Sequence, residues 1–539
     1  MKKLSTGLSL FVVVLTMATL TQKVSAQAER KVDPWYQDGL FIHNITYGSI
    51  NPANIVNIPY SGLNDIVVSY SGQNGKYRAF DDGVKTRLFD ANVFGIRKFD
   101  KLAFKGNINY SNHYSEDMRW NATVLTSELN PFLLADTLRY DTLTNDARTE
   151  SFVIDGSVAY DLSNRLTVGV SAKYTVAHKA DQSDPRIKAN AARTAIMPGI
   201  NWNVSGTITL GLAGIVEFYH EDDKSTVEDN MIGEHNHVYI YKGLGGFEGK
   251  EALGYNRRYD GLKFGGSLNF STNGSFKNFT EFKFVSNSEN ATDSKDTYVD
   301  YKGGDFSQTT MALNSRFMLA RPKVQHNLII EASIDNSKGV WSVQKPKKNE
   351  WNKTYHEITS TETIHKESDM TAALTYNATF LKSGTPHLSV SATAAYKQVS
   401  VKQFPDENHA KYTKLNAGLV INKKWTVNKM RFLTEISGGM NHALNPLDIS
   451  VSFDEKPIEE RLPIERFYKG YYLPKYTYLS ADDYYASIQL GASYPLALFS
   501  SNGWLNLTVD ASIRKYSEKS PIFKNTDKKN IGLKLNYIF

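Results

Sequence analysis

The densest group of side chains that could ligate a metal is the run from Glu234 to His237, which reads Glu-His-Asn-His. A His-x-His pair on a strand places both imidazoles on one face, an arrangement that suits zinc or copper. No third ligand stands at a motif-like spacing, and the run lies in the longest polar stretch, where a solvated histidine pair is the simpler interpretation. The chain contains no cysteine, which excludes thiolate ligands, disulfides and a cysteine nucleophile. We predict neither a metal site nor a cofactor.

Two further patterns resemble catalytic motifs but lack their spacing. The glycine-rich run 243–250 is not a phosphate loop, because Lys250 is followed by Glu251 instead of serine or threonine and no βαβ unit surrounds it. A hydrolase would need a serine, a histidine and an acid on neighbouring strands, and the chain has no G-x-S-x-G elbow. The histidines near predicted strand ends cannot be paired with a serine from spacing: His113, His178 and His220. We therefore predict that the protein is not an enzyme, with a barrel hydrolase as the weaker alternative.

The composition limits which elements could carry a site. The chain has 539 residues, of which 22% are charged and 41% hydrophobic, and the mean hydropathy is −0.41. These values exclude a polytopic helical membrane protein, and 31 tyrosines, 27 phenylalanines and 7 tryptophans exclude a disordered chain. The formal net charge of +6 falls to +3 without residues 1–26, which hold three lysines and no acid. This weak charge and the absence of a nucleic-acid motif argue against a nucleic-acid partner.

Residues 1–26 have the features of a cleaved signal peptide. Lys2 and Lys3 form a positive start, residues 8–20 are apolar, and 24–26 form a small-residue cleavage site. The apolar run is too short to favour a transmembrane helix, although a retained N-terminal anchor is the alternative. We expect the mature chain to begin at Gln27 and to leave the cytoplasm.

From about residue 64 onward, apolar residues alternate with polar or small ones at period 2, which predicts β-strands. In 504–516 the apolar set Leu505, Leu507, Val509, Ala511 and Ile513 alternates with Asn506, Thr508, Asp510, Ser512 and Arg514. A bilayer explains this pattern, because a closed barrel satisfies every backbone hydrogen bond while alternate side chains face lipid and lumen. The low mean hydropathy then reflects a polar lumen and polar loops.

Short turns alternate with long polar connections along the chain. We expect short turns near 99–100, 161–164, 204–205, 271–275, 321–323, 382–386, 424–428 and 499–502. We expect long polar connections at 116–147, 178–191, 221–260, 286–307, 337–366, 444–482 and 517–527, with a brief exception at 404–409. This asymmetry is typical of an outer-membrane barrel with short periplasmic turns and long extracellular loops. A large secreted β-sandwich or propeller is the alternative, but a propeller would show repeats, which are absent.

These patterns predict an all-β fold, a closed antiparallel transmembrane β-barrel. One opening strand, eight hairpins and one closing strand make about 18 strands, with 14 or 16 as alternatives. The predicted domains are 1–26 as signal peptide, 27–63 as an N-terminal extension or lumen plug, and 64–539 as the barrel. Residues 32–63 are aromatic and rich in asparagine and proline, which favours a plug, and a periplasmic extension is the alternative.

The last residues form an alternating apolar strand that ends in an aromatic side chain. Leu533, Leu535, Tyr537 and Phe539 share one face. This ending resembles the sorting signal that the barrel-assembly machinery reads on outer-membrane proteins of Gram-negative bacteria. An exposed edge strand of this kind can add to another sheet by β-augmentation. The resemblance implies the outer membrane as location, the assembly machinery as a transient partner and membrane lipid as a permanent one.

The stretch 47–54 contains the tripeptide Asn51-Pro52-Ala53. It resembles the "NPA" element of two barrel families, the long-chain fatty-acid channels and the PorP-type barrels of type IX secretion in Bacteroidota. In the first family the N-terminal residues form a hatch inside the barrel. The whole mature chain is similar to outer-membrane barrels of Bacteroidota that have no assigned substrate, which implies fold and location but no chemistry.

A tyrosine-rich segment at 466–485 is a candidate binding surface. Its central rings are Tyr468, Tyr471, Tyr472 and Tyr476, with basic residues beside them. Exposed aromatic rings could stack on sugars or dock a partner protein. Self-packing of a folded extracellular loop is the alternative.

We predict an integral outer-membrane barrel that acts as a channel or transporter for a small or hydrophobic solute. The alternative is a plugged barrel without transport, an accessory subunit that binds a protein partner in an envelope secretion or nutrient-uptake complex. Lumen-facing charges of mixed sign, such as Lys173 and Asp155, indicate no preference for anions or cations.

Overall fold

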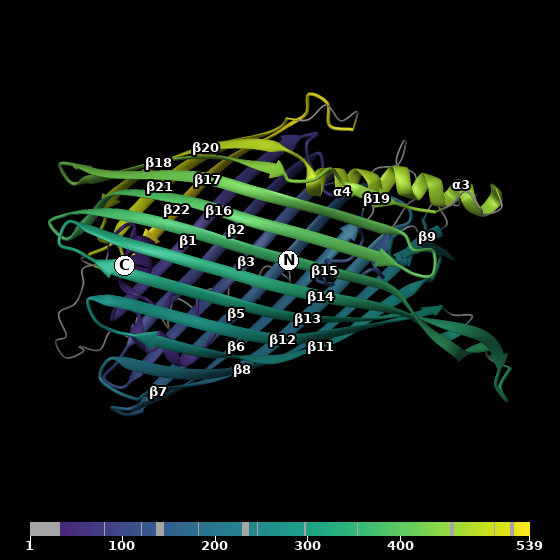
Figure 1. Cartoon of the computed structure of the whole chain (residues 1–539), viewed down its shortest axis with the longest axis horizontal. Helices are drawn as coiled ribbons and strands as arrows, with labels where there is room; N and C mark the ends of the chain where they lie inside the picture. Colours follow the sequence, from purple (N-terminus) through teal and green to yellow (C-terminus); the bar gives the residue numbers. More distant parts are fainter. Residues whose placement is uncertain are drawn as a thin grey trace.

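A computed structural model describes residues 33–539, apart from 80, 120, 136–144, 182, 229–236, 245, 296–297, 353, 453–457, 501 and 518–521. The predicted signal peptide lies outside the described residues. Eighteen long strands form one closed antiparallel barrel, as the sequence pattern predicts (Figure 1). The barrel closes where the first strand pairs with the last, with Ile66 opposite Tyr537 and Tyr70 opposite Leu533. The closure leaves no free sheet edge along these two strands.

The barrel strands follow chain order, and each pairs with its sequence neighbours. They are β1 (Gly62–Gly75), β2 (Lys85–Lys98), β3 (Leu102–Met118), β5 (Asn145–Ser163), β6 (Leu166–Asp181), β7 (Arg186–Asn203), β8 (Ile208–Thr226), β11 (Asn256–Thr272), β12 (Phe276–Lys295), β13 (Tyr298–Ala320), β14 (Val324–Lys348), β15 (Thr354–Lys382), β16 (Thr385–Gln403), β17 (His409–Val427), β18 (Met430–Ala443), β20 (Asp483–Pro495), β21 (Trp504–Tyr516) and β22 (Asp527–Ile538). A three-residue strand, β19 (Asp448–Ser450), extends the sheet beside β17.

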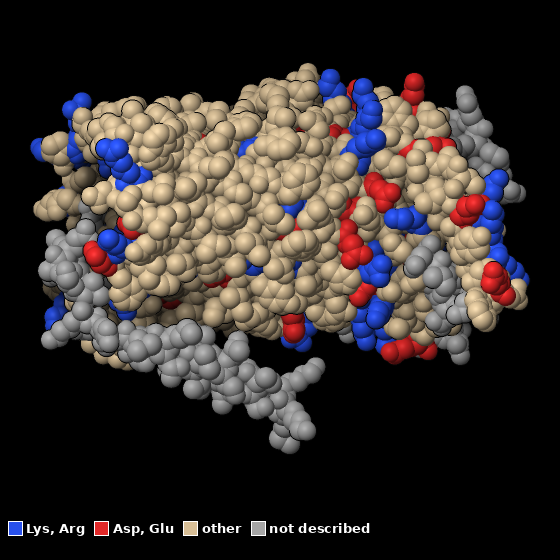
Figure 2. Space-filling model, turned by 90° about the horizontal axis from the view of Figure 1, so that it is seen from below, with Lys and Arg blue, Asp and Glu red and all other residues tan. Residues whose placement is uncertain are grey.

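The outer wall is apolar and the inner wall is polar. Leu507 and Val509 of β21 are 46% and 44% exposed on the outside, whereas Asn506 and Thr508, which alternate with them, are buried inside. Charged side chains gather toward the two ends of the molecule and leave a broad, nearly uncharged band between them (Figure 2). Such a band is the surface that a bilayer covers. Among the described residues, no helix combines the length and the apolar character needed to cross a membrane.

One end of the barrel carries tight turns, and the other carries larger connections. The tight end includes the links at 99–101, 164–165, 273–275, 321–323 and 383–384. The opposite end differs from the expectation at three places: 178–191, 286–307 and 337–366 are mostly strand, because β6, β7 and β12 to β15 run on beyond the apolar band. Above the membrane both faces of a strand meet water, so the alternation of side chains fades while the backbone ladder continues.

The larger connections fold over the open end of the barrel. Strands β4 (Leu134–Ala135), β9 (His237–Tyr241) and β10 (Phe247–Glu251) make a small antiparallel sheet there. Helices α3 (Ile458–Phe467), η3 (Tyr468–Tyr472) and α4 (Leu473–Ser480) lie at the same end (Figure 1). Two apolar clusters join these connections to the strand ends, so the cap has a packed core.

Candidate functional site

The site is the lumen, and its central feature is an inner segment formed by residues 33–60. It contains helix α2 (Tyr36–His43) and the 3₁₀ turn η1 (Pro52–Asn57), and it lies near the tight-turn end of the barrel. Hydrogen bonds join it to opposite walls: Arg431 of β18 donates to Asp33 at 2.7 Å, and Asn51 donates to Asn201 Oδ1 of β7 at 2.9 Å. A segment held from several strands at once crosses the lumen rather than lining one wall.

The tripeptide Asn51-Pro52-Ala53 sits against a notch in the wall of β6 and β7. A Cβ atom on Gly169 would lie 2.6 Å from the Ala53 nitrogen, and one on Gly199 would lie 2.1 Å from Asn51 Oδ1. These two glycines let the backbone of η1 approach the strands closely. Pro52 at the start of η1 needs no partner for its nitrogen, and Asn51 caps the turn by accepting from the Ala53 amide at 3.0 Å.

A buried cluster of carboxamides fixes this contact. The Asn51 amide donates to Asn201 Oδ1 and to Asn269 Oδ1, both at 2.9 Å, and Asn201 donates to Asn54 Oδ1 at 2.8 Å. All four side chains are buried. Because each unsatisfied buried amide would cost free energy, the cluster specifies one position of the segment.

The other end of the inner segment is held by Arg316 on β13. Its guanidinium donates to the carbonyls of Asn44, at 3.1 Å, and Phe41, and lies 4.0 Å from the centre of the Phe41 ring. Gln325 on β14 donates to the Ile42 carbonyl at 2.5 Å. The last carbonyls of a helix have no hydrogen-bond partners within the helix. The Arg316 guanidinium and the Gln325 carboxamide supply hydrogen bonds to the carbonyls at this end of α2.

Tyr36 links the inner segment to the closing seam of the barrel. Its hydroxyl donates to Asp65 of β1 at 3.0 Å, and Asn536 of β22 donates to the same carboxylate at 3.0 Å. Burial, and then the Asp65 charge, raise the pKa of Tyr36 above its ordinary value, so the phenol remains a donor. The inner segment is therefore bonded to Asp65, the side chain that also joins the first strand to the last.

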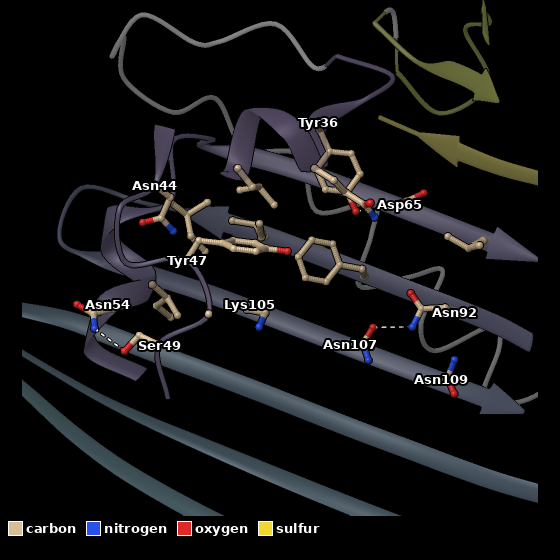
Figure 3. Close-up of a pocket in the computed structure, with 18 of the residues that line it drawn as sticks. Tyr36, Asn44, Tyr47, Ser49, Asn54, Asp65, Asn92, Lys105, Asn107 and Asn109 are labelled. Carbon is tan, nitrogen blue, oxygen red and sulfur yellow. Dashed lines mark hydrogen bonds between the residues drawn. The ribbon is translucent and has the colours of Figure 1, made fainter. Parts of the chain in front are cut away.

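Helix α2 separates two cavities. One, of about 860 Å³, is lined by Tyr36 and Leu40 of the helix, by Asn44 directly after it, and by strands β1 to β3 (Figure 3). The other, of about 790 Å³, is lined by Gly39 and His43 of the helix, by Trp35 directly before it, and by tight turns of the barrel. The helix is thus a one-layer partition between the lumen and the tight-turn end.

A second inward-folded segment, residues 121–135, lies at the opposite end, and we call it the outer latch. Glu221 of β8 accepts from the amides of Val124 and Leu125 at 2.7 and 2.8 Å. Arg257 of β11 donates to the Phe132 carbonyl at 2.9 Å and pairs with Asp293 at 2.7 Å. These charged wall residues are fully buried, and their ionic hydrogen bonds are the strong kind.

Three of the four candidate binding tyrosines face inward into the cap. Tyr471, Tyr472 and Tyr476 are buried with Phe467 and Tyr412 in one cluster, and Tyr468 packs on its edge. Burial raises the pKa of Tyr471, Tyr472 and Tyr476. The structure therefore has the self-packed arrangement and does not present these rings to a sugar or a partner. The rings differ from the predicted binding surface because the strand ends beneath them offer apolar area, which the rings cover.

The candidate assembly signal forms the outer face of the closing strand. Leu533 and Leu535 are exposed toward the lipid side. Tyr537 is buried under the β20–β21 turn, where its hydroxyl donates to the Leu496 carbonyl at 2.9 Å. Phe539 packs beside it and beside Phe499. In the folded barrel this strand is paired on both sides, so a signal of this kind would be readable only before closure.

The candidate metal and phosphate motifs give no site in the described part of the chain. Of the run 234–237, only His237 is described, and no group of three or more ligating side chains is found among the described residues. The glycine-rich run lies in and around the β9–β10 turn, where Lys250 pairs with Glu248 at 2.5 Å.

Sequence reasoning missed the residues of the barrel wall that hold the two inward segments. Gly169, Gly199, Asn201 and Arg316 hold the inner segment, and Glu221 holds the outer latch. An inward-facing glycine or arginine fits the polar face of any barrel strand, so only long-range contacts mark these positions. The usable signals were the aromatic, asparagine- and proline-rich composition of residues 32–63 and the resemblance of the tripeptide, which together predicted a segment that could plug a lumen.

The fold and the occupied lumen define a β-barrel of the outer-membrane type. The chain belongs to a family of unknown function (DUF6850), whose model matches residues 52–539. None of the curated proteins searched matches the chain. Similar solved structures include the copper transporter OprC, at 8% identity over 89% of this chain and 80% of that one, with a TM-score of 0.42. They also include the CymD monoaromatic hydrocarbon channel, at 11% identity, 95% and 98% coverage and a TM-score of 0.31. A Pseudomonas aeruginosa FadL homologue has 9% identity, 93% and 95% coverage and a TM-score of 0.32.

Proposed function

We propose that the protein is a channel or transporter for a small solute across the outer membrane, with the inner segment as its gate. The single observation that supports this most is the partition by α2, which has an open cavity on each side. A displacement of one helix and one 3₁₀ turn would join the two cavities. Hydrogen bonds and an apolar cluster around Tyr36, Leu40 and Ile58 hold the segment in place. Each hydrogen bond can be exchanged for water at a net cost of about 0.5–1.5 kcal/mol.

The chemistry of the cavity walls favours a polar solute over a hydrophobic one. Carboxamides and charged groups form most of the wall on the barrel side, among them Asn92, Lys105 and Asn107. A long-chain hydrophobic solute would leave these groups without partners, which is unfavourable.

A chemical lock tests the gate directly, and the cysteine-free chain makes it specific. Asn54→Cys with Asn201→Cys would place two thiols where the native amides touch at 2.8 Å. Bridging them with a short bifunctional thiol reagent should abolish conductance in planar bilayers, and a reducible reagent should restore it on cleavage. Conductance that is unaffected by the bridge would overturn the gate.

A second candidate is the plugged barrel without transport, acting as an accessory subunit of an envelope complex. It is favoured by the presence of inward-folded segments near both ends of the lumen. A wild-type protein and a variant lacking 33–60 that are both silent in planar bilayers would support this candidate. A pull-down from native membranes would then identify the partner.

A further inference from the structure

We propose that the 860 Å³ lumen cavity binds an uncharged, hydroxyl-rich solute with the chemistry of a small carbohydrate, and that Tyr47 is its stacking platform. This inference rests on the proposed transport function and names its substrate class. It depends on three features of the cavity: one exposed ring, a row of carboxamides and a balanced charge.

Tyr47 is an exposed aromatic ring inside a polar lumen. Its side chain is 49% exposed, whereas Tyr36 and Tyr60 of the same inner segment are 4% exposed. The Phe41 ring meets it edge to face at a centroid distance of 6.3 Å, which supports the tyrosine from one side. Figure 3 shows Tyr47 extending from the inner segment into the space beside β2 and β3. A sugar ring that stacks on the open face would bury apolar area that water now covers.

The wall beside Tyr47 offers paired donors and acceptors. Asn92 of β2 stands opposite Asn109 of β3 and donates to Oδ1 of the diagonal neighbour Asn107 at 2.7 Å. Asn109 stands two residues further along the same face, and all three line the cavity (Figure 3). A carboxamide donates two hydrogen bonds and accepts others, which matches hydroxyl groups that both donate and accept.

The charges of the described lining balance, which disfavours an ionic solute. Two carboxylates, Asp65 and Asp90, stand against two ammonium groups, Lys105 and Lys534. Asp65 already accepts hydrogen bonds from Tyr36 and Asn536. A net anion or cation would be attracted by one pair and repelled by the other, whereas a neutral solute can bond to both.

Binding to the purified full chain in detergent tests this proposal without requiring transport. The probes are maltotriose, cellotriose and tri-N-acetylchitotriose, measured by calorimetry, with glutamate, lysine and palmitate as contrasting probes. We expect at least one carbohydrate to bind and Tyr47→Ala to weaken it about tenfold, because the stacking contact is lost. Tyr47→Phe should bind nearly as well as the wild type. Tyr355→Ala, on the outer β14–β15 hairpin, is the control for removal of an exposed tyrosine.

The outcomes separate this proposal from the transport function. No carbohydrate binding, unchanged binding by Tyr47→Ala, or tighter binding of a charged or fatty probe would each overturn it. Carbohydrate binding by a protein that is silent in bilayers would leave this site standing and contradict transport. Conductance without carbohydrate binding would contradict this site and leave the transport function standing.

Discussion

A Cβ atom on Gly199 of β7 would lie 2.1 Å from Oδ1 of Asn51 and 2.7 Å from Cδ of Pro52. Side-chain atoms do not approach other atoms this closely, so position 199 must be a glycine for the inner segment to lie against the wall. The contact couples a wall residue to a tripeptide almost 150 positions earlier in the chain. It also gives a direct way to unseat the segment without touching its own sequence.

Gly199→Ala should displace the tripeptide from its notch. Overpacking at a well-fitted contact costs about 1–3 kcal/mol, and the cluster of carboxamides around Asn51 would lose its geometry as well. We expect a lower thermal midpoint and a higher open probability in planar bilayers. Gly156→Ala is the matched control, because a Cβ atom there meets nothing within 4 Å. Equal behaviour of the two variants would show that the notch does not hold the segment.

Arg316→Met should loosen the other end of the inner segment. The carbonyls of Asn44 and Phe41 would lose their cationic donor inside the barrel, and hydrogen bonds to charged groups contribute about 1.5–3 kcal/mol each. We expect faster proteolysis within 33–45 and increased conductance. Arg321→Met, at an exposed turn, controls for the loss of charge. Unaltered proteolysis would contradict an anchoring role for Arg316.

The strands could be predicted from the sequence, whereas the lumen contacts could not. Lipid imposes a period of 2 on every crossing, so Leu505 to Ile513 reveal their strand without knowledge of its neighbours. The contact between Gly199 and Asn51 has no such local signature, because it depends on which segment enters the barrel. The tyrosines of η3 show the same limit. The sequence shows that this segment is rich in aromatic rings, but not whether the rings face solvent or pack inside the cap.

Strand ends were also hard to predict, for a different reason. Residues 286–307 look like a loop because their side chains are polar, yet Phe306 and Glu289 are paired in a continuing ladder. Polar side chains are compatible with a strand wherever both faces meet water or other polar groups. The alternating pattern therefore identifies the part of each strand that lies in the membrane, and not the full length of the strand.

Glu221→Gln should release the outer latch. The carboxylate accepts both the Val124 and the Leu125 amide, and a neutral carboxamide can offer only one acceptor oxygen. We expect about tenfold faster hydrogen exchange at 123–127, which corresponds to a loss near 1.4 kcal/mol in the free energy of local opening. Asp222→Asn, the neighbouring residue on the outer face, should leave this exchange unchanged. If both variants exchange at the wild-type rate, the latch is held by other contacts.

Phe539→Ala should reduce assembly without weakening the folded barrel greatly. Phe539 packs on Phe499 and Tyr537 at the rim, and its amide bonds to the Asn64 carbonyl through the backbone, which the substitution keeps. We expect less protein in outer-membrane fractions, with a thermal midpoint of the purified protein close to the wild type. Phe499→Ala removes the opposite ring of the same contact and is the control. A parallel loss of yield in both variants would indicate a packing defect instead of a lost assembly signal.

The β9–β10 hairpin of the cap should open in acid. Glu248 bridges Lys242 at 2.6 Å and Lys250 at 2.5 Å, and the two ammonium groups lie over the rings of Trp341 and Tyr301. Burial acts to raise the pKa of Glu248, but the two lysines outweigh burial and hold the pKa below its ordinary value of 4.5. A carboxyl with a depressed pKa stabilises the fold above its unfolded pKa, and this contribution is lost as the pH falls through the folded value.

Hydrogen exchange at 237–251, corrected for the intrinsic effect of pH, measures this opening. We expect protection at neutral pH that declines below pH 4.5, where the carboxyl of the unfolded chain is already protonated. Glu248→Gln should be less protected at neutral pH and should lose the acid-dependent step. High salt should weaken the wild-type protection in the same direction, since the three side chains are partly exposed and their attraction is screened. A wild-type hairpin whose protection is flat across this range would show that the ionic bridge does not hold the cap.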